Sequence, residues 1–188
     1  MLAQPCRRIV FTIKSSDQGW GGDPTDHDTY NHSWTWFEAG LERWCKPAPA
    51  ETPDAGGQSP EQHPRPSLQL EDLCTVYPEV ELRPETGEHA FKYSLFPNEH
   101  LRVQQNLTAR REPKVHRVVW SYTDGIDPAR DVEAAERLKA QGRGPATGDG
   151  KFVRDLKLGD VVTLWAKARF PQWSNYVESA TIDVYYAI

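Results

Sequence analysis

The sequence predicts an all-β fold, an antiparallel β-sandwich of jelly-roll type with one short helix. Short stretches of alternating apolar and polar residues recur along the chain, and Gly, Pro, Asn and Asp cluster between them, as is typical of strands joined by turns. Only one stretch has a helical pattern, so the βαβ alternation of a parallel sheet is missing. A closed β-barrel fits the same pattern and is the alternative.

A single domain over residues 1–188 is expected, because a chain of this length with 38% hydrophobic and 11% aromatic residues can bury one core. The stretch 46–66 is rich in Pro and Gly and contains nothing apolar larger than alanine or proline. Such a composition cannot bury a core, so we expect a mobile insertion there.

The chain begins with an alternating strand at 7–13, followed over 15–32 by a loop rich in Gly, Asp and Asn. Alternation resumes at 33–44. One face of this second strand is apolar and is expected to face the core, whereas the other carries Trp34 and Trp36 among glutamates.

Three more segments follow in the middle of the chain. The stretch 68–82 is apolar in part, and its proline indicates a strand edge or a turn. Strands are expected at 99–110 and 114–123, and the second of these is expected to be central because both of its faces carry apolar side chains.

The predicted helix covers 128–141, with a proline in its first turn and a glycine after its end. The glycine-rich stretch 142–151 lacks the spacing of a phosphate loop and is predicted to be a turn. The last two strands are expected at 160–170 and 175–188. The turn between them places Trp173 at the edge of the sheet.

Charge and cysteine content limit the expected partners and compartment. A net charge of −5 argues against binding to nucleic acid, which is recognised largely by neutralising phosphates. No apolar run reaches the roughly 18 residues of a membrane helix, and the start has no stretch of signal-peptide length, so no membrane contact is expected. Three cysteines leave at least one thiol unpaired, which favours a reducing compartment and predicts a cytoplasmic protein.

Several blocks of sequence stand out among the expected loops and strands. They read SSDQGWGG, SWTWFEAGLERW, HRVVWSYTD and GDGKFVRDLKLGDVVTLWAKARFPQWSNYVESATIDVYYAI. These blocks resemble a domain found in many fungal proteins, some of which carry other modules. The resemblance covers most of the chain apart from 46–66. It implies a β-rich domain of uncharacterised function and supplies no catalytic residue.

Aromatic and polar side chains gather in the first long loop and at the nearby strand ends. Aromatic faces flanked by carboxylates and amides suit a sugar ring, and they suit a protein interface equally. We therefore predict a non-enzymatic binding or interaction module for a small glycan or a protein partner, although each tryptophan taken singly could be a core residue. The predicted ligand-binding residues are Asp17, Gln18, Trp20, Asp23, Tyr30, Trp34, Trp36, Trp173 and Asn175.

The alternative function is a glycan-active or metal-dependent hydrolase that uses Asp17, Asp23, Asp28 and His32. The oxygens and imidazole of these side chains suit a metal ion, but the EF-hand pattern and the HExxH frame are both missing. Aspartates that form turns with their own backbone explain the same residues. No G-x-S-x-G nucleophile elbow occurs. We therefore predict no catalytic residue, no metal site and no cofactor.

Overall fold

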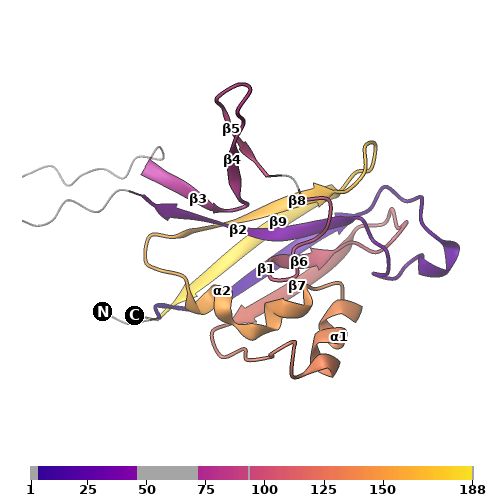
Figure 1. The fold of residues 1–188 in the computed structure, drawn as a ribbon. Helices are drawn as coiled ribbons and strands as arrows, with labels where there is room; N and C mark the ends of the chain where they lie inside the picture. Colours follow the sequence, from indigo (N-terminus) through magenta and orange to yellow (C-terminus); the bar gives the residue numbers. More distant parts are fainter. Residues whose placement is uncertain (1–3, 46–71, 93, 188) are drawn as a thin grey trace, which may run out of the picture.

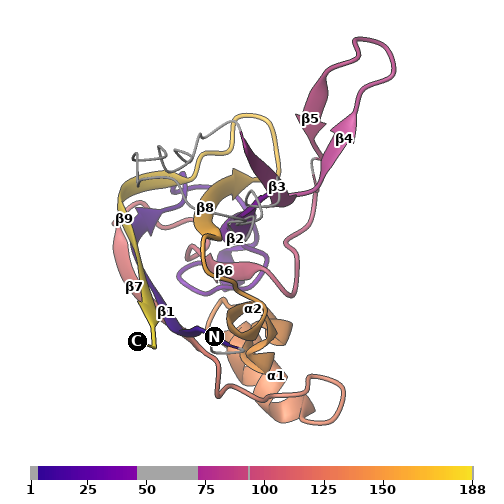
Figure 2. The same ribbon diagram turned by 90° about the vertical axis from the view of Figure 1, so that its left-hand side faces the viewer.

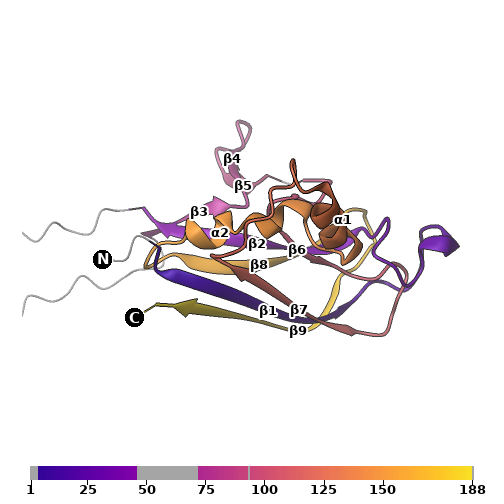
Figure 3. The ribbon, with the colours of Figure 1, turned by 90° about the horizontal axis from the view of Figure 1, so that it is seen from below.

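The computed structural model describes residues 4–45, 72–92 and 94–187. Its two main sheets are antiparallel and stack face to face, which confirms the predicted β-sandwich (Figure 2). The same two layers are visible from below (Figure 3). No closed barrel forms in this part of the chain. The insertion expected at 46–66 lies outside the described residues.

The first sheet is built around β1 (Cys6–Ser16), which pairs with β7 (Lys114–Ser121) on one side and β9 (Tyr176–Tyr186) on the other. β7 is therefore an edge strand, and the central position expected for it is wrong. The reason is that its second face is solvated: Val115 is 59% exposed, although its apolar side chain made that face look buried.

The second sheet is built around β2 (Thr35–Trp44), which pairs with β8 (Val161–Ala168) on one side. On its other side, the first half of β2 pairs with β6 (Arg102–Gln105) and the second half pairs with β3 (Leu73–Tyr77). The first strand thus pairs with the last and the second with the last but one, which gives the chain its jelly-roll wrapping.

The hydrophobic core lies between the two sheets. The strand periodicity places every second side chain of β1 and β2 in it, because successive residues of a strand point to opposite faces. The core residues on the strands include Ile9, Phe11, Ile13, Phe37, Ala39, Leu41, Val103, Val118 and Trp120.

Two helices lie along one side of the sandwich (Figure 1). α1 (Val132–Ala140) confirms the predicted helix but begins after the N-cap Asp131, a few residues later than expected. A 3₁₀ helix (Pro145–Asp149) and α2 (Lys151–Arg154) occupy most of the stretch predicted to be a turn, and α2 buries Val153 in the core. None of the helices in the described ranges is long and apolar enough to span a membrane.

A hairpin of β4 (Val80–Leu82) and β5 (His89–Phe91) projects from the sandwich (Figure 1). The sequence analysis did not predict β5, because the surrounding residues are charged and the strand is only 3 residues long. One aromatic contact ties the hairpin to the second sheet: the rings of Phe91 and Trp165 lie 4.7 Å apart.

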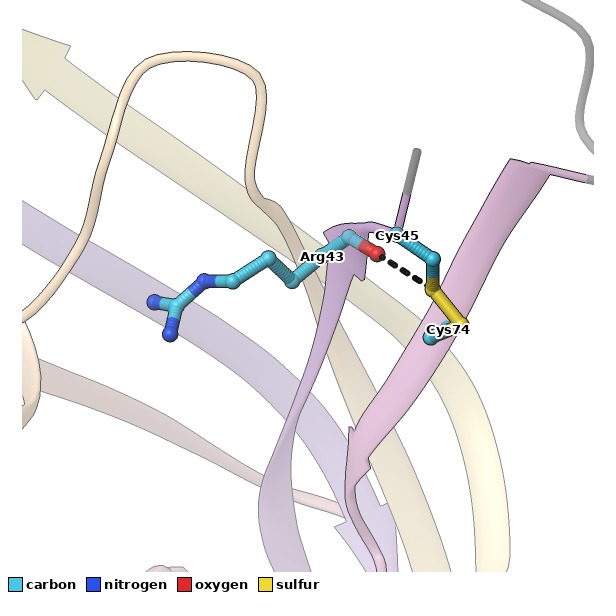
Figure 4. Close-up of a disulfide and its surroundings, with 3 residues drawn as sticks. All are labelled: Arg43, Cys45 and Cys74. Atoms are coloured by element: carbon cyan, nitrogen blue, oxygen red, sulfur yellow. Dashed lines mark hydrogen bonds between the residues drawn. A yellow bond between two sulfur atoms is a disulfide. The ribbon is translucent and has the colours of Figure 1, made fainter. Parts of the chain in front are cut away.

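A disulfide joins Cys45, which directly follows β2, to Cys74 in β3 (Figure 4). The two Cα atoms are 5.6 Å apart, a usual separation for bridged cysteines. Cys45 Sγ also lies 3.5 Å from the carbonyl oxygen of Arg43. The third cysteine, Cys6, is buried and free. This pairing weakens the inference of a reducing compartment, which rested on the odd cysteine count.

Candidate functional site

The loop at 17–34 extends beyond one end of the sandwich, where the turn between β8 and β9 meets it (Figure 1). The loop contains a short 3₁₀ helix (Pro24–Asp26). All but one of the predicted ligand-binding residues belong to this loop and turn or to the residues next to them; the exception, Trp36, lies inside β2.

The base of the loop is buried and polar. Asp17 is fully buried, and its Oδ2 accepts a hydrogen bond from the Ala109 backbone N–H at 3.0 Å, while the Gln18 N–H donates to its Oδ1. Burial raises the pKa of the Asp17 carboxyl, although the N–H donors act in the opposite direction. Gln18 is also buried, and its amide donates to the Trp20 carbonyl. These contacts fix the path of the backbone.

A second group of buried polar contacts centres on Asn106, which is fully buried between the two sheets and the loop. Its Oδ1 accepts from the Ser15 hydroxyl at 2.7 Å. Its amide nitrogen lies within hydrogen-bond distance of the Ser16 carbonyl, the Thr35 hydroxyl and Asn175 Oδ1. Asn175 in turn donates to the Trp36 carbonyl at 3.0 Å. The predicted ligand-binding residue Asn175 therefore links strands.

Tyr30 is held beneath the loop by two side chains of β7. Its hydroxyl lies 3.0 Å from His116 Nε2 and accepts from Lys114 Nζ at 3.0 Å. Burial, with a smaller contribution from Lys114, lowers the pKa of His116 from 6.5 to about 4, so the imidazole is neutral at pH 7. His116 Nδ1 is buried without a partner in the described structure. The role of Tyr30 visible here is to anchor the loop.

The acidic tip of the loop makes local contacts. Asp23 caps the 3₁₀ helix and accepts from both the backbone and the hydroxyl of Thr25, which lowers the pKa of its carboxyl. His32 Nδ1 lies 2.7 Å from Asp26 Oδ2, and Arg110 Nη1 lies 3.3 Å from Asp28 Oδ1.

The hydrolase alternative needed these carboxylates and His32 to converge with Asp17. The described residues contain no group of three or more His, Cys, Asp or Glu side chains placed to hold a metal ion. Asp17 is enclosed at the base, whereas the other members are exposed at the tip.

Five aromatic rings form a continuous row across this end of the molecule. The ring centroids are separated by 5.8 Å from Trp20 to Trp173, 5.3 Å from Trp173 to Phe170, 6.0 Å from Phe170 to Trp34 and 6.3 Å from Trp34 to Phe96. Each contact is an edge-to-face contact, a favoured geometry for aromatic pairs. We call these five residues the aromatic row.

The aromatic row is partly open to solvent. Trp20 is 48% exposed, Phe96 is 57% exposed and Phe170 is 39% exposed, while Trp34 and Trp173 are half-buried. Large aromatic side chains in contact with one another and with water are typical of binding surfaces. Three of the predicted ligand-binding residues, Trp20, Trp34 and Trp173, are brought together here.

Two local features hold the row in place. The Arg169 guanidinium lies 4.1 Å above the Trp34 ring and 4.2 Å from the Phe96 ring, so it fixes both by cation–π contact. Gly21 has a φ of 97°, and a Cβ there would lie 3.0 Å from the Trp173 ring. Glycine is therefore required for the loop to approach Trp173 so closely.

Trp36 does not belong to this surface. Its side chain is fully buried, and its Nε1 donates to Glu38 Oε1 at 2.8 Å. Glu38 is buried as well and pairs with Lys167 at 2.5 Å. Trp36 was predicted to bind ligand, with core packing as the other possibility, and its full burial makes the ligand-binding prediction wrong. The segment after β5 lies over this part of the strand, since the Asn98 N–H also donates to Glu38.

Sequence reasoning missed Phe96, Phe170 and Arg169. Phe170 and Arg169 directly precede the turn that was singled out for Trp173, so the cluster RFPQW could have drawn attention to them. Phe96 lies in a segment with no periodic pattern, and no sequence signal pointed to it.

Comparisons with known proteins supply no relative: no family model matches this chain, and no curated protein or solved structure matches it. The resemblance to a fungal β-rich domain therefore stays a prediction, and the function has to be argued from the site itself.

Proposed function

We propose that this protein is a non-enzymatic binding module whose aromatic row holds a small glycan. The observation that carries the proposal is the row itself, in which rings from three separate segments form one partly exposed surface. A sugar presents C–H groups to an aromatic face and hydroxyls to polar neighbours, and this combination suits tryptophan-rich surfaces.

A cavity at one end of the row favours a small ligand over a protein partner. It has a volume of about 450 Å³ and begins at Trp34 and Phe96. Ligand sites commonly have volumes of roughly 300–1,000 Å³ and combine apolar walls with a few polar groups. The amide side chains of Asn31 and Gln105 line this cavity. We call it the row-end cavity.

The test is a glycan array followed by calorimetry with the full chain. The double substitution Trp20→Ala with Trp173→Ala should abolish glycan binding, because it removes two of the five stacking rings while leaving the sandwich core intact. Tyr185→Ala is the matched control: Tyr185 is an exposed aromatic residue near the opposite end of β1, where it stacks on Arg8, and its loss should leave binding unchanged.

Two results would contradict the proposal. If the wild-type chain binds no saccharide on the array, the glycan assignment fails, and capture of a defined protein that depends on Trp20 would assign the row to a protein partner instead. If mass spectrometry shows that a bound saccharide is cleaved during incubation, the non-enzymatic part is wrong and the hydrolase alternative takes its place.

The cytoplasmic location is part of the same proposal and depends on the redox state of Cys45 and Cys74. Cytosolic thiol systems keep most cysteines reduced, so a cytoplasmic protein should have all three thiols free in the cell. Alkylation in denaturant at the moment of lysis, followed by mass spectrometry, counts them, since the buried Cys6 reacts only when the chain is unfolded. Three alkylated cysteines support the cytoplasm, whereas a single alkylated Cys6 places the protein in an oxidising compartment.

A further inference from the structure

The row-end cavity contains a buried arginine, Arg102, and Arg102, Arg110 and Arg143 share a buried Nε without a partner. Arg102 opens β6 and is only 9% exposed, and it lines the cavity together with Trp34 and Phe96. Its Nη2 donates to the Arg143 carbonyl at 2.9 Å. Its Nε is buried without a partner, and no ion pair joins Arg102 to a carboxylate among the described residues.

Two other arginines of the chain donate more hydrogen bonds than Arg102 does. Arg43 makes a two-point contact with Asp160, at 2.9 Å from Nε and 2.7 Å from Nη2. Arg154 donates to three backbone carbonyl oxygens, those of residues 122, 124 and 149. Arg102 has one such contact, although it is the most enclosed of the three.

A buried cation without a counter-ion is costly, because burial removes its hydration and nothing replaces it. Burial lowers the pKa of the Arg102 guanidinium, and the charges of Glu99 and Glu38 only partly oppose this effect. A planar guanidinium with free donors matches the two oxygens of a carboxylate in a bidentate contact. Because Nε itself is closed to solvent, a carboxylate in the cavity would contact the guanidinium through its two terminal nitrogens.

The remaining charges on the cavity wall leave it with more positive than negative groups. Lys139 of α1 reaches the rim, and its Nζ lies 3.6 Å from Glu136 on the exposed face of the same helix. Glu99 is the carboxylate of the lining and is exposed, while the buried Glu38 pairs with Lys167; both favour the charged form of Arg102 without forming an ion pair with it. His32 at the rim pairs with Asp26.

We propose that the row-end cavity binds the carboxylate of an acidic sugar unit, with Arg102 as its bidentate partner and Lys139 as a second cation, while neighbouring units of the same saccharide lie on the aromatic row. This inference rests on the proposed glycan-binding function and specifies the ligand as an anionic saccharide.

The test compares each acidic oligosaccharide with its own neutral form. Calorimetry uses tetrasaccharides of galacturonic, glucuronic and mannuronic acid, and the methyl esters of the same tetrasaccharides, which keep the rings and lose the charge. At least one free acid should bind about tenfold or more tightly than its ester, because a hydrogen-bonded charge pair in a partly enclosed site is worth that much. Added salt should reduce this preference.

Two substitutions locate the preference. Arg102→Gln should reduce the acid-to-ester ratio to near one. Because removal of a buried side chain can alter folding, the exposed Lys139→Gln is the second variant, and it should lower the ratio by a few-fold while the fold is retained. Arg130→Gln removes another exposed cation, which lies near the start of α1 and does not line the cavity, and should leave the ratio unchanged.

Three outcomes would overturn this inference, and they differ from a failure of the proposed function. If acids and esters bind equally well, the row binds glycans, but Arg102 does not recognise a carboxylate on them. If sulfated saccharides bind while all uronates do not, the ligand anion is a sulfate ester and the carboxylate assignment is wrong. If neither acidic nor neutral saccharides bind, the glycan-binding function itself fails.

Discussion

The base of the 17–34 loop and the aromatic row lie at the same end of the sandwich, but they differ in what their side chains contact. At the base, Asp17, Asn106 and Asn175 direct their polar atoms at backbone and side-chain partners inside the protein. In the row, Trp20 and Phe96 keep about half of their surface in water. Polarity therefore does not mark the proposed binding surface, because the polar groups of the base are used in contacts within the protein while the aromatic rings stay exposed.

The largest effect should come from the tryptophan that the sequence pattern wrongly grouped with the exposed ones. Trp36→Ala should lower the free energy of unfolding by about 3–5 kcal/mol, because it opens a cavity in a fully buried site and removes the donor to Glu38. Urea denaturation followed by circular dichroism measures it. A loss below about 1 kcal/mol would mean that this face of β2 is not packed as described.

The next largest effect should come from the polar base. Asn106→Ala should lower the free energy of unfolding by about 3 kcal/mol, because it leaves several buried polar groups without partners. The control is Asn31→Ala, an exposed asparagine of the same loop, which should change stability by less than about 0.5 kcal/mol. If the two substitutions lowered the free energy of unfolding equally, the polar contacts of Asn106 would not stabilise the base of the loop more than an exposed residue does.

The anchoring of Tyr30 should make stability depend on pH. The pKa of His116 is lowered to about 4 in the folded chain, whereas the unfolded imidazole titrates near 6.5. The unfolded state therefore binds a proton first, and the free energy of unfolding should decrease by about 3 kcal/mol as the pH falls from above 6.5 towards 4. In His116→Gln this part of the decrease should be lost, and in the exposed His89→Gln it should persist. An unchanged profile in His116→Gln would show that the imidazole is not buried and neutral.

The smallest effect on stability should come from the row. Trp20→Ala should lower the free energy of unfolding by about 1 kcal/mol, the value of a partly exposed aromatic pair, since it removes the edge-to-face contact with Trp173. The same urea experiment measures it beside Trp36→Ala. A loss as large as that of Trp36→Ala would make Trp20 a structural residue and would weaken the proposed binding role.

Much of the fold followed from the sequence because its strands are strictly periodic. The alternation around Ile9, Phe11 and Ile13 predicted β1 and its buried face, and the last two strands followed from the same signal. Prediction failed where burial depended on segments without a pattern: residues around Asn98 cover Trp36, and the hairpin containing β5 has no apolar alternation.

The candidate site could be predicted only in part, for a related reason. Trp20, Trp34 and Trp173 were identifiable as aromatic residues near one end of a sheet, but the link between them depends on Phe170 and Arg169. Arg102 looked like an ordinary strand residue, since no sequence pattern reveals that a buried cation has no counter-ion. Such a property emerges only when the partners of every group are known.

The disulfide between Cys45 and Cys74 also determines what happens if the chain is cut. Because the bridge ties the end of β2 to β3, a protease that cleaves between the two cysteines produces two fragments that remain one covalent molecule. Such a nicked protein would migrate as a single band until a reductant is added.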